Sequence, residues 1–406
     1  MTQRQDNTPD DLLVIGAGIS GLAAAHYGRR QGWSVRVLEG NSRPGGCFHS
    51  HVFPGQAGFW LELGAHTCFN SYGQLLEILA DLEGLTALVP KPRLNYQLWA
   101  GGHRHAIPAR LHWWELLRSL PRLRSVKKSS ATVADYYGAI VGPRNYQEVL
   151  GPAFDAVICQ EAAGFPASAL FRKRARSKHQ PKSFSFPGGL SWVTQRLAES
   201  LGGQLTCGAE AVSVQDCEEG FEVLLATGQR WRGRRLVLAT PPQAAGSLLK
   251  DAAPDLAALL GEIQPAQVES LGLCVRTEAV TWPRLAGVIG VAEDFFSIVS
   301  RDYLEHTRFA GGLRGFTFHF RPGRLSPEEK RQQAARVLGV TPADFIGTMD
   351  ARHTLPALRL GQTERVERID ARLAGQPLAL TGNYFHGLSI EDCLVRSRSE
   401  IQRLAA

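Results

Sequence analysis

An α/β fold is predicted by this sequence, with a doubly wound parallel sheet in one domain and a second, intertwined domain of mixed helices and strands. The first observation is a βαβ pattern, in which an apolar strand at Leu12–Ile15 and a second strand at Ser34–Leu38 flank a helical pattern over Leu22–Gln31. The second observation is that further strand patterns recur in the middle of the chain, at 205–214, 221–226 and 230–239. The third is length, because 406 residues exceed a single core.

Three glycines at the end of the first strand have the spacing of a dinucleotide-binding turn. Gly16 allows the tight turn, Gly18 lets the backbone approach a pyrophosphate, and Gly21 lets the helix pack closely on the sheet. The free N–H groups and positive dipole end of the helix stabilise that anion. Glu39 ends the second strand and can accept hydrogen bonds from the adenosine ribose. The pattern therefore predicts a Rossmann-like unit that binds a dinucleotide.

Composition narrows the class of protein. The chain is 44% hydrophobic and 20% charged, which is typical of a globular enzyme. The first eleven residues contain no apolar run, and Leu12–Ala25 is too short to span a bilayer, so we expect neither a secretory signal nor a transmembrane helix. Seven scattered cysteines without a Cys-x-x-Cys pair predict reduced thiols. We therefore expect a cytoplasmic protein.

A net charge of +7 is concentrated in two basic runs. The run from Arg118 to Lys128 mixes cations with leucines and follows Trp113 and Trp114, which suits a peripheral contact with the inner face of a membrane. The run from Arg172 to Lys178 suits substrate carboxylates, anionic headgroups or a solvated charged face. No nucleic-acid-binding module accompanies either run, so we expect no nucleic-acid partner.

Several motifs identify a family resemblance. Arg43-Pro-Gly-Gly46, directly after the acid, resembles an element of the FAD-dependent amine oxidase and protoporphyrinogen oxidase superfamily. Leu61–Phe69 resembles the family segment that passes the flavin ring, and Leu378–Cys393 resembles the closing motif. Tyr96–Pro108 and further landmarks at 132–137, 151–152 and 184–190 are similar to the protoporphyrinogen oxidase branch. The resemblance implies an α/β, flavin amine oxidase-like fold that binds FAD.

The resemblance also implies the division of the chain and the residues around the cofactor. The FAD-binding domain is expected from 1–70, 183–250 and 365–406, and an α+β substrate domain from 71–182 and 251–364, with a helical, basic part at about 110–180. The residues expected against FAD are Gly16, Gly18, Ile19, Ser20, Gly21, Glu39, Gly40, Arg43, Gly45, Gly46, Gly64, Ala65, His66, Thr67, Val212, Ala239, Thr240, Gly382, Asn383, Gly387, Leu388 and Ser389.

The expected reaction is hydride transfer from a substrate C–H bond to the flavin N5, with oxygen or another acceptor reoxidising the flavin. By resemblance the favoured substrate is a porphyrinogen, and an amine or an isoprenoid are alternatives. A flavin-binding protein without turnover is the alternative from another class. The flavin itself carries the chemistry, with His66 and His386 as candidate catalytic side chains. Cys47, His49 and His51 alternate like metal ligands, but their place beside the cofactor loop favours no metal.

Overall fold

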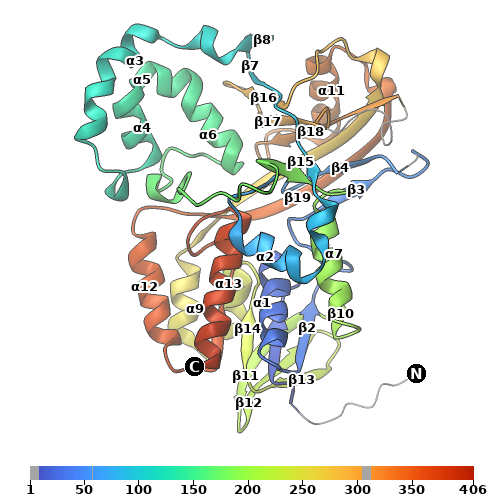
Figure 1. Cartoon of the computed structure of the whole chain (residues 1–406), viewed down its shortest axis with the longest axis vertical. Helices are drawn as coiled ribbons and strands as arrows, with labels where there is room; N and C mark the ends of the chain where they lie inside the picture. Colours follow the sequence, from blue (N-terminus) through green and yellow to red (C-terminus); the bar gives the residue numbers. More distant parts are fainter. Residues whose placement is uncertain (1–8, 57, 304–311) are drawn as a thin grey trace.

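The computed structural model describes residues 9–56, 58–303 and 312–406 (Figure 1). Residues 1–8 of the expected FAD-binding domain and 304–311 of the expected substrate domain lie outside the described residues. Two main sheets organise the chain, a parallel sheet at one end of the molecule and a larger mixed sheet at the other (Figure 1). This confirms the predicted mixed α/β class, whereas the domain boundaries stay a prediction.

The parallel sheet is assembled from three separated parts of the chain. Its strands, in spatial order, are β10 (Leu205–Cys207), β2 (Val35–Glu39), β1 (Leu12–Ile15), β14 (Leu236–Leu238) and β20 (Leu378–Leu380). Both faces of β1 are buried: Leu12 and Val14 pack toward α1 (Ile19–Arg30) and α13 (Ile390–Ala405), and Leu13 and Ile15 pack on the opposite face. Burial on both faces explains why this strand reads as a continuous apolar run.

Two of the strands predicted in the middle of the chain are each divided between two sheets. The pattern over 205–214 forms β10 and then β11 (Ala211–Cys217), and the pattern over 230–239 forms β13 (Arg230–Gly233) and then β14. Gly208, at φ +69°, lies in the first break. The third pattern forms β12 (Gly220–Leu225), which pairs with β11 and β13 in a small antiparallel sheet. An alternating pattern does not reveal where a strand leaves one sheet for another.

The mixed sheet covers the end of the parallel sheet where the strands point. Its order is β19 (Phe345–Ala357), β15 (Gln264–Arg276), β18 (Leu313–Phe320), β17 (Phe295–Ser300), β16 (Gly287–Gly290), β7 (Tyr96–Ala100) and β8 (His103–Ala106). One face packs on α11 (Pro327–Leu338) through Leu271, Leu273 and other apolar residues. The other face meets the hairpin of β3 (Ser50–Val52) and β4 (Trp60–Glu62). A Cβ on Gly272 or Gly315 would lie within 2.5 Å of the side chains of Leu63 and Leu61, so these glycines let the two layers approach closely.

The remaining strands form a small sheet, and nine α-helices among the described residues have not yet been named. A small sheet contains β5 (Cys68–Phe69), β9 (Ser183–Ser185) and β6 (Val89–Pro90). The helices not yet named are α2 (Gly73–Asp81), α3 (Trp113–Ser119), α4 (Val133–Val141), α5 (Pro143–Asn145), α6 (Gly151–Ile158), α7 (Ser191–Ser200), α8 (Pro242–Leu249), α9 (Pro254–Gly261) and α12 (Gln362–Leu373). Helices α3 to α6 form a lobe beside the mixed sheet (Figure 1). Among the described helices, none has the length and apolar character needed to cross a bilayer.

Candidate functional site

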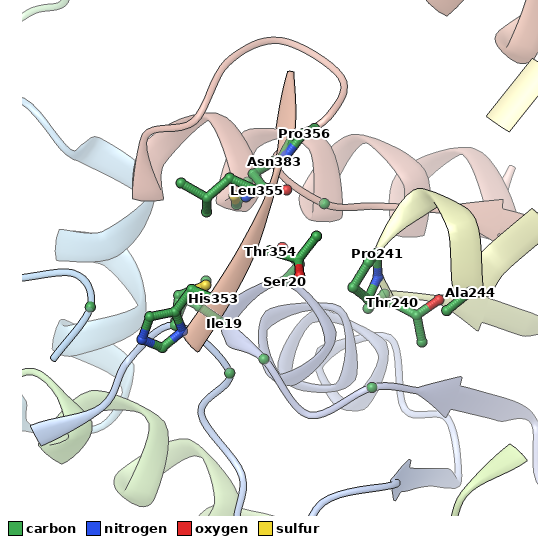
Figure 2. A pocket seen from close by; sticks show the side chains of 18 of the residues that line it. Ile19, Ser20, Thr240, Pro241, Ala244, His353, Thr354, Leu355, Pro356 and Asn383 are labelled. Atoms are coloured by element: carbon green, nitrogen blue, oxygen red, sulfur yellow. The ribbon is translucent and has the colours of Figure 1, made fainter. Parts of the chain in front are cut away.

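A cavity of about 750 Å³ lies between the parallel sheet and the mixed sheet. One end reaches Glu39 and Val212, and the other reaches Ser270 and His319 on the mixed sheet. Figure 2 shows side chains from β19, among them His353 and Leu355, across from the start of α1. The cavity is therefore bounded by a glycine-rich backbone turn on one side and by side chains of a sheet on the other.

The glycine turn, residues 16–21, brings bare backbone to the cavity. Gly16 has φ +99°, and a Cβ there would lie 2.9 Å from the carbonyl oxygen of Ala239. A Cβ on Gly21 would lie only 1.8 Å from the carbonyl oxygen of Gly16. Gly18, by contrast, has an extended backbone at φ −69°, and nothing of the protein lies within 4 Å of the position its Cβ would take. No side chain caps the N-terminus of α1, so its N–H groups are available to an anion.

Glu39 supports this turn from the end of β2. Its carboxylate accepts hydrogen bonds from the Ala17 backbone N–H at 2.7 Å and from the backbone and side-chain nitrogens of Asn41 at 2.9 and 2.6 Å. The carboxylate also lines the cavity. A carboxylate offers about four lone-pair positions, so one remains for a ribose hydroxyl. Glu39 can therefore fix the turn and contact the nucleotide together.

Arg43 has a structural role that its position in the sequence did not reveal. Its guanidinium donates to the carbonyl oxygens of Pro44, Gly46 and Phe48 at 3.1 to 3.2 Å, and it does not line the cavity. Burial lowers its pKa. These bonds hold the loop in which Gly45 and Gly46 take positive φ values of +115° and +55° and line the cavity. Contact between Arg43 and a phosphate stays a prediction.

The cavity brings together most of the residues predicted to contact the cofactor. Those lining it are Gly16, Gly18, Ile19, Ser20, Glu39, Gly40, Gly45, Gly46, Gly64, Ala65, His66, Val212, Ala239, Thr240, Gly382, Asn383 and Leu388. Those outside its lining are Gly21, Arg43, Thr67, Gly387 and Ser389. Thr67 instead accepts a hydrogen bond from Lys91 at 2.7 Å, and Gly21 packs the helix on the turn.

The start of the last helix is held by an arginine from the second basic run. Ser389 caps α13 by accepting a hydrogen bond from the backbone N–H of Asp392. Arg174 donates to the Asp392 carboxylate at 2.7 Å and to the Ser389 hydroxyl at 3.1 Å. His386 lies beside Phe385 rather than in the cavity lining. The geometry thus favours a packing role for these residues, and the catalytic role suggested for His386 stays a prediction that the cavity does not support.

The wall opposite the glycine turn is called here the sheet-side wall and consists of Val268, Ser270, His319 and residues 353–356. Ser270 and His319 face each other across the β15–β18 ladder, and the Ser270 hydroxyl lies 2.9 Å from His319 Nδ1. The His319 ring stacks near that of His66, with 6.4 Å between centroids. His353 Nε2 donates to the carbonyl oxygen of Leu63 at 3.1 Å.

Burial keeps these imidazoles neutral. Desolvation lowers the pKa of His319 to about 3 and that of His66 to about 4. It also lowers the pKa of His353. The charged side chains in the cavity lining are Glu39 and Glu210, and both lie at the Gly40 end. No lysine or arginine among the described residues lines the cavity.

Sequence reasoning missed the sheet-side wall, the end of α6 at Val157–Cys159 and the start of α8 at Pro241–Ser247. The residues of the sheet-side wall lie on three strands that are distant in sequence, so register alone brings them together. No local motif marks them. Within the described residues there is also no group of three or more His, Cys, Asp or Glu placed to hold a metal ion.

A parallel sheet with a glycine turn, an acid at the end of the second strand and a closing C-terminal segment defines a dinucleotide-binding protein. Residues 19–308 match the family of flavin-containing amine oxidoreductases, and the chain belongs to that family. FAD is therefore its cofactor, and the family to which it belongs consists of flavin-containing oxidoreductases. Family membership favours an enzyme over a flavin-binding protein without turnover.

Curated relatives are similar over part of the chain. An L-amino acid dehydrogenase from Synechocystis sp. is 24% identical over 286 residues, which cover 59% of this chain and 57% of the relative. The flavin-dependent L-tryptophan oxidase RebO from Lentzea aerocolonigenes is 40% identical over 77 residues, or 18% of this chain and 16% of that protein. The chain thus spans little more than half the length of the first relative and much less of the second.

Solved structures are similar over nearly the whole chain. A candidate protoporphyrinogen oxidase from Exiguobacterium sp. 255-15 superposes with a TM-score of 0.74 at 17% identity, covering 97% of this chain and 98% of the other. Cyclohexylamine oxidase from Brevibacterium oxydans gives 0.73 at 16% identity, covering 98% and 99%. At these identities the likeness shows the fold, and it confirms the flavin amine oxidase-like architecture.

Proposed function

We propose that this enzyme oxidises a C–H bond next to nitrogen or carbon in a small molecule, and that a porphyrinogen is the first substrate to test. The observation that carries the proposal is one continuous cavity with a dinucleotide-type turn at one side and the sheet-side wall at the other. The resemblance of Tyr96–Pro108 to the protoporphyrinogen oxidase branch supports the choice of porphyrinogen.

An amine is the second candidate, supported by the uncharged sheet-side wall. Neutral imidazoles accept hydrogen bonds from amine N–H groups, and the wall is otherwise largely apolar. An isoprenoid would use the apolar residues but leave the polar pair Ser270 and His319 without a substrate partner.

The chain's own residues supply binding and position. The glycine turn and the N-terminus of α1 would hold the diphosphate, and Glu39 the ribose. Gly64 and Ala65 on one side and Gly382 and Asn383 on another would border the isoalloxazine. Bound FAD supplies the hydride acceptor. The sheet-side wall would then place the substrate and exclude water.

Anaerobic mixing of the FAD-loaded protein with porphyrinogen, amine and polyene panels tests this proposal. We expect the flavin absorption band to bleach with a porphyrinogen or an amine. A porphyrinogen panel that leaves the band unchanged removes the first candidate, and an unchanged band with all three panels removes the proposed function.

We also propose a peripheral membrane contact through α3 and the turn of 3₁₀ helix at Leu120–Arg124. Large apolar side chains protrude here, with Trp114 81% exposed and Trp113 and Leu117 more than half exposed. Cations interleave with them along the same run. Tryptophan at the headgroup level beside lysine and arginine is the pattern of an interfacial contact with anionic lipid.

Vesicle sedimentation tests this contact. We expect the FAD-loaded protein to pellet with vesicles containing phosphatidylglycerol but not with pure phosphatidylcholine, and high salt to weaken the binding. The double variant W113S/W114S is expected to stay in the supernatant, with W33S, a distant partly buried tryptophan, as the matched control. Equal binding by the double variant contradicts the proposal.

A further inference from the structure

The side chains of the sheet-side wall limit which chemical groups a substrate can place against them, a point that the proposed function leaves open. Most of its polar groups come from one face of the mixed sheet, where Val268 and Ser270 on β15 lie beside His319 on β18 and His353 on β19. These side chains line the cavity from the mixed sheet, whereas Glu39 lines it from the end of β2 in the parallel sheet. A substrate bound there meets serine, imidazole and apolar groups.

The hydrogen bonds within the wall determine which imidazole nitrogen atoms are left to bind a substrate. Ser270 Oγ lies 2.9 Å from His319 Nδ1, so Nε2 is the ring nitrogen without a protein partner among the described residues. A carbonyl oxygen can only accept, so the contact of His353 Nε2 with Leu63 places a proton on Nε2 and leaves Nδ1 as an acceptor. The wall therefore offers uncharged hydrogen-bonding nitrogen atoms.

The groups around His319 oppose a positive charge on it. His66 stacks beside it, His353 lies on the next strand but one, and Ser270 is its polar partner. Lys91 lies near His66, where it donates to the His66 carbonyl oxygen at 3.0 Å. Burial lowers the pKa of His319 to about 3, so the imidazole stays neutral over the range in which most enzymes work.

The wall also lacks a partner for a carboxylate. No arginine or lysine among the described residues lines the cavity, and the carboxylates of Glu39 and Glu210 are at the opposite end. Burying a carboxylate without a cation or several hydrogen-bond donors is strongly unfavourable. A substrate ammonium would likewise find no carboxylate near His319.

We infer that His319, oriented by Ser270, is a specificity-determining residue that receives the substrate nitrogen in its uncharged N–H form, and that substrate carboxylates stay outside the cavity. This inference rests on the proposed function, because it assumes a nitrogen-bearing substrate. It distinguishes amines and pyrroles from amino acids.

Matched compounds test the inference through binding alone. The FAD-loaded protein is first reduced with dithionite under argon, so that no turnover occurs, and its thermal midpoint is followed as ligand is added. The pairs are phenethylamine with L-phenylalanine, and coproporphyrinogen tetramethyl ester with coproporphyrinogen. We expect at least tenfold tighter binding of phenethylamine than of phenylalanine, or an ester that binds as tightly as its acid or more tightly. Tighter binding of the carboxylate form in either pair overturns the inference, as does the absence of binding by all four compounds.

Variants separate recognition from support of the fold. His319→Phe keeps a ring beside His66 but removes the hydrogen-bonding nitrogen, and it is expected to weaken phenethylamine or ester binding about tenfold. His319→Gln is expected to recover part of that loss, and His103→Gln, on the exposed edge strand β8, serves as the control. Unchanged affinity in His319→Phe, or a loss that only follows FAD content, overturns the role of His319. Flavin bleaching in the separate turnover assay reports on the proposed function itself.

Discussion

The two sides of the cavity are built on different principles. The glycine turn presents backbone: Gly16 and Gly21 are each required by a close approach to a backbone carbonyl oxygen, and Gly18 faces open space. The sheet-side wall presents side chains, with Ser270 and His319 held by cross-strand register. We expect the first side to recognise what all dinucleotides share and the second to contact what differs between substrates. Short local sequence motifs predict a site made of backbone, whereas no local motif predicts a site made of side chains from several strands.

The largest expected effect comes from Gly21→Ala. The new Cβ would lie 1.8 Å from the carbonyl oxygen of Gly16, and backbone on both sides cannot yield without moving α1 off the sheet. We expect a loss of more than about 3 kcal/mol in the free energy of unfolding, measured by urea denaturation of the apoprotein. Wild-type stability in this variant would contradict the packing role of Gly21.

Gly18→Ala tests the same glycine turn in a different way, because it should change cofactor binding and leave folding unchanged. Nothing lies within 4 Å of the new Cβ and the backbone is extended, so the free energy of unfolding of the apoprotein is expected to change by less than about 0.5 kcal/mol. The methyl group would occupy open space beside the cavity, where we expect the diphosphate, so FAD affinity is expected to fall at least tenfold in a fluorescence titration. Unchanged FAD affinity would show that Gly18 is not at the diphosphate.

His319 of the sheet-side wall and two histidines beside the wall, His66 and His49, are expected to make the fold sensitive to acid. His66, His49 and His319 have folded-state pKa values lowered to about 4, 4 and 3 from 6.5, so the unfolded chain binds more protons below pH 6.5. Their contribution to stability is complete above pH 6.5 and is lost as the pH falls toward 4. Burial raises the pKa of Glu62 to about 7 and also raises the pKa values of Asp155, Glu293 and Glu391, which gives a partly compensating, opposite slope.

Thermal midpoints between pH 4 and 7 measure this effect. We expect the midpoint to fall with falling pH, and the fall to be smaller in His319→Asn than in the wild type. A midpoint that is flat over this range in the wild type, or an equal slope in the variant, would contradict the assignment of a buried neutral imidazole.

Glu39→Gln is expected to lower FAD affinity to an extent comparable with Gly18→Ala. The amide keeps one oxygen for the Ala17 N–H but presents an NH₂ group where the carboxylate accepts from Asn41. Both hydrogen bonds from Asn41 are lost, and a ribose hydroxyl would no longer donate to a charged group, where a hydrogen bond contributes about 1.5–3 kcal/mol. FAD affinity is therefore expected to fall by roughly tenfold or more, with Glu210→Gln, at the same end of the cavity, as the comparison.

Much of the cofactor side was predictable because its signals are local. Gly45, Gly46, Gly382 and Asn383 were placed by motif, and all four line the cavity. Arg43 was predicted to lie against FAD, yet its guanidinium donates to three carbonyl oxygens of its own loop. Sequence position identifies such a loop but does not reveal which atoms its arginine reaches.

The chain by itself determined the βαβ unit, the FAD and the family, because strand, glycine turn, helix and acid are contiguous and each position has one steric or electrostatic cause. Only the tertiary structure decided that Ser270, His319 and His353 form one wall, since their proximity depends on the pairing of β15 with β18 and β19. A shift of one residue in that register would turn each of these side chains to the other face of the sheet. Register over such distances in sequence is a property of the folded sheet.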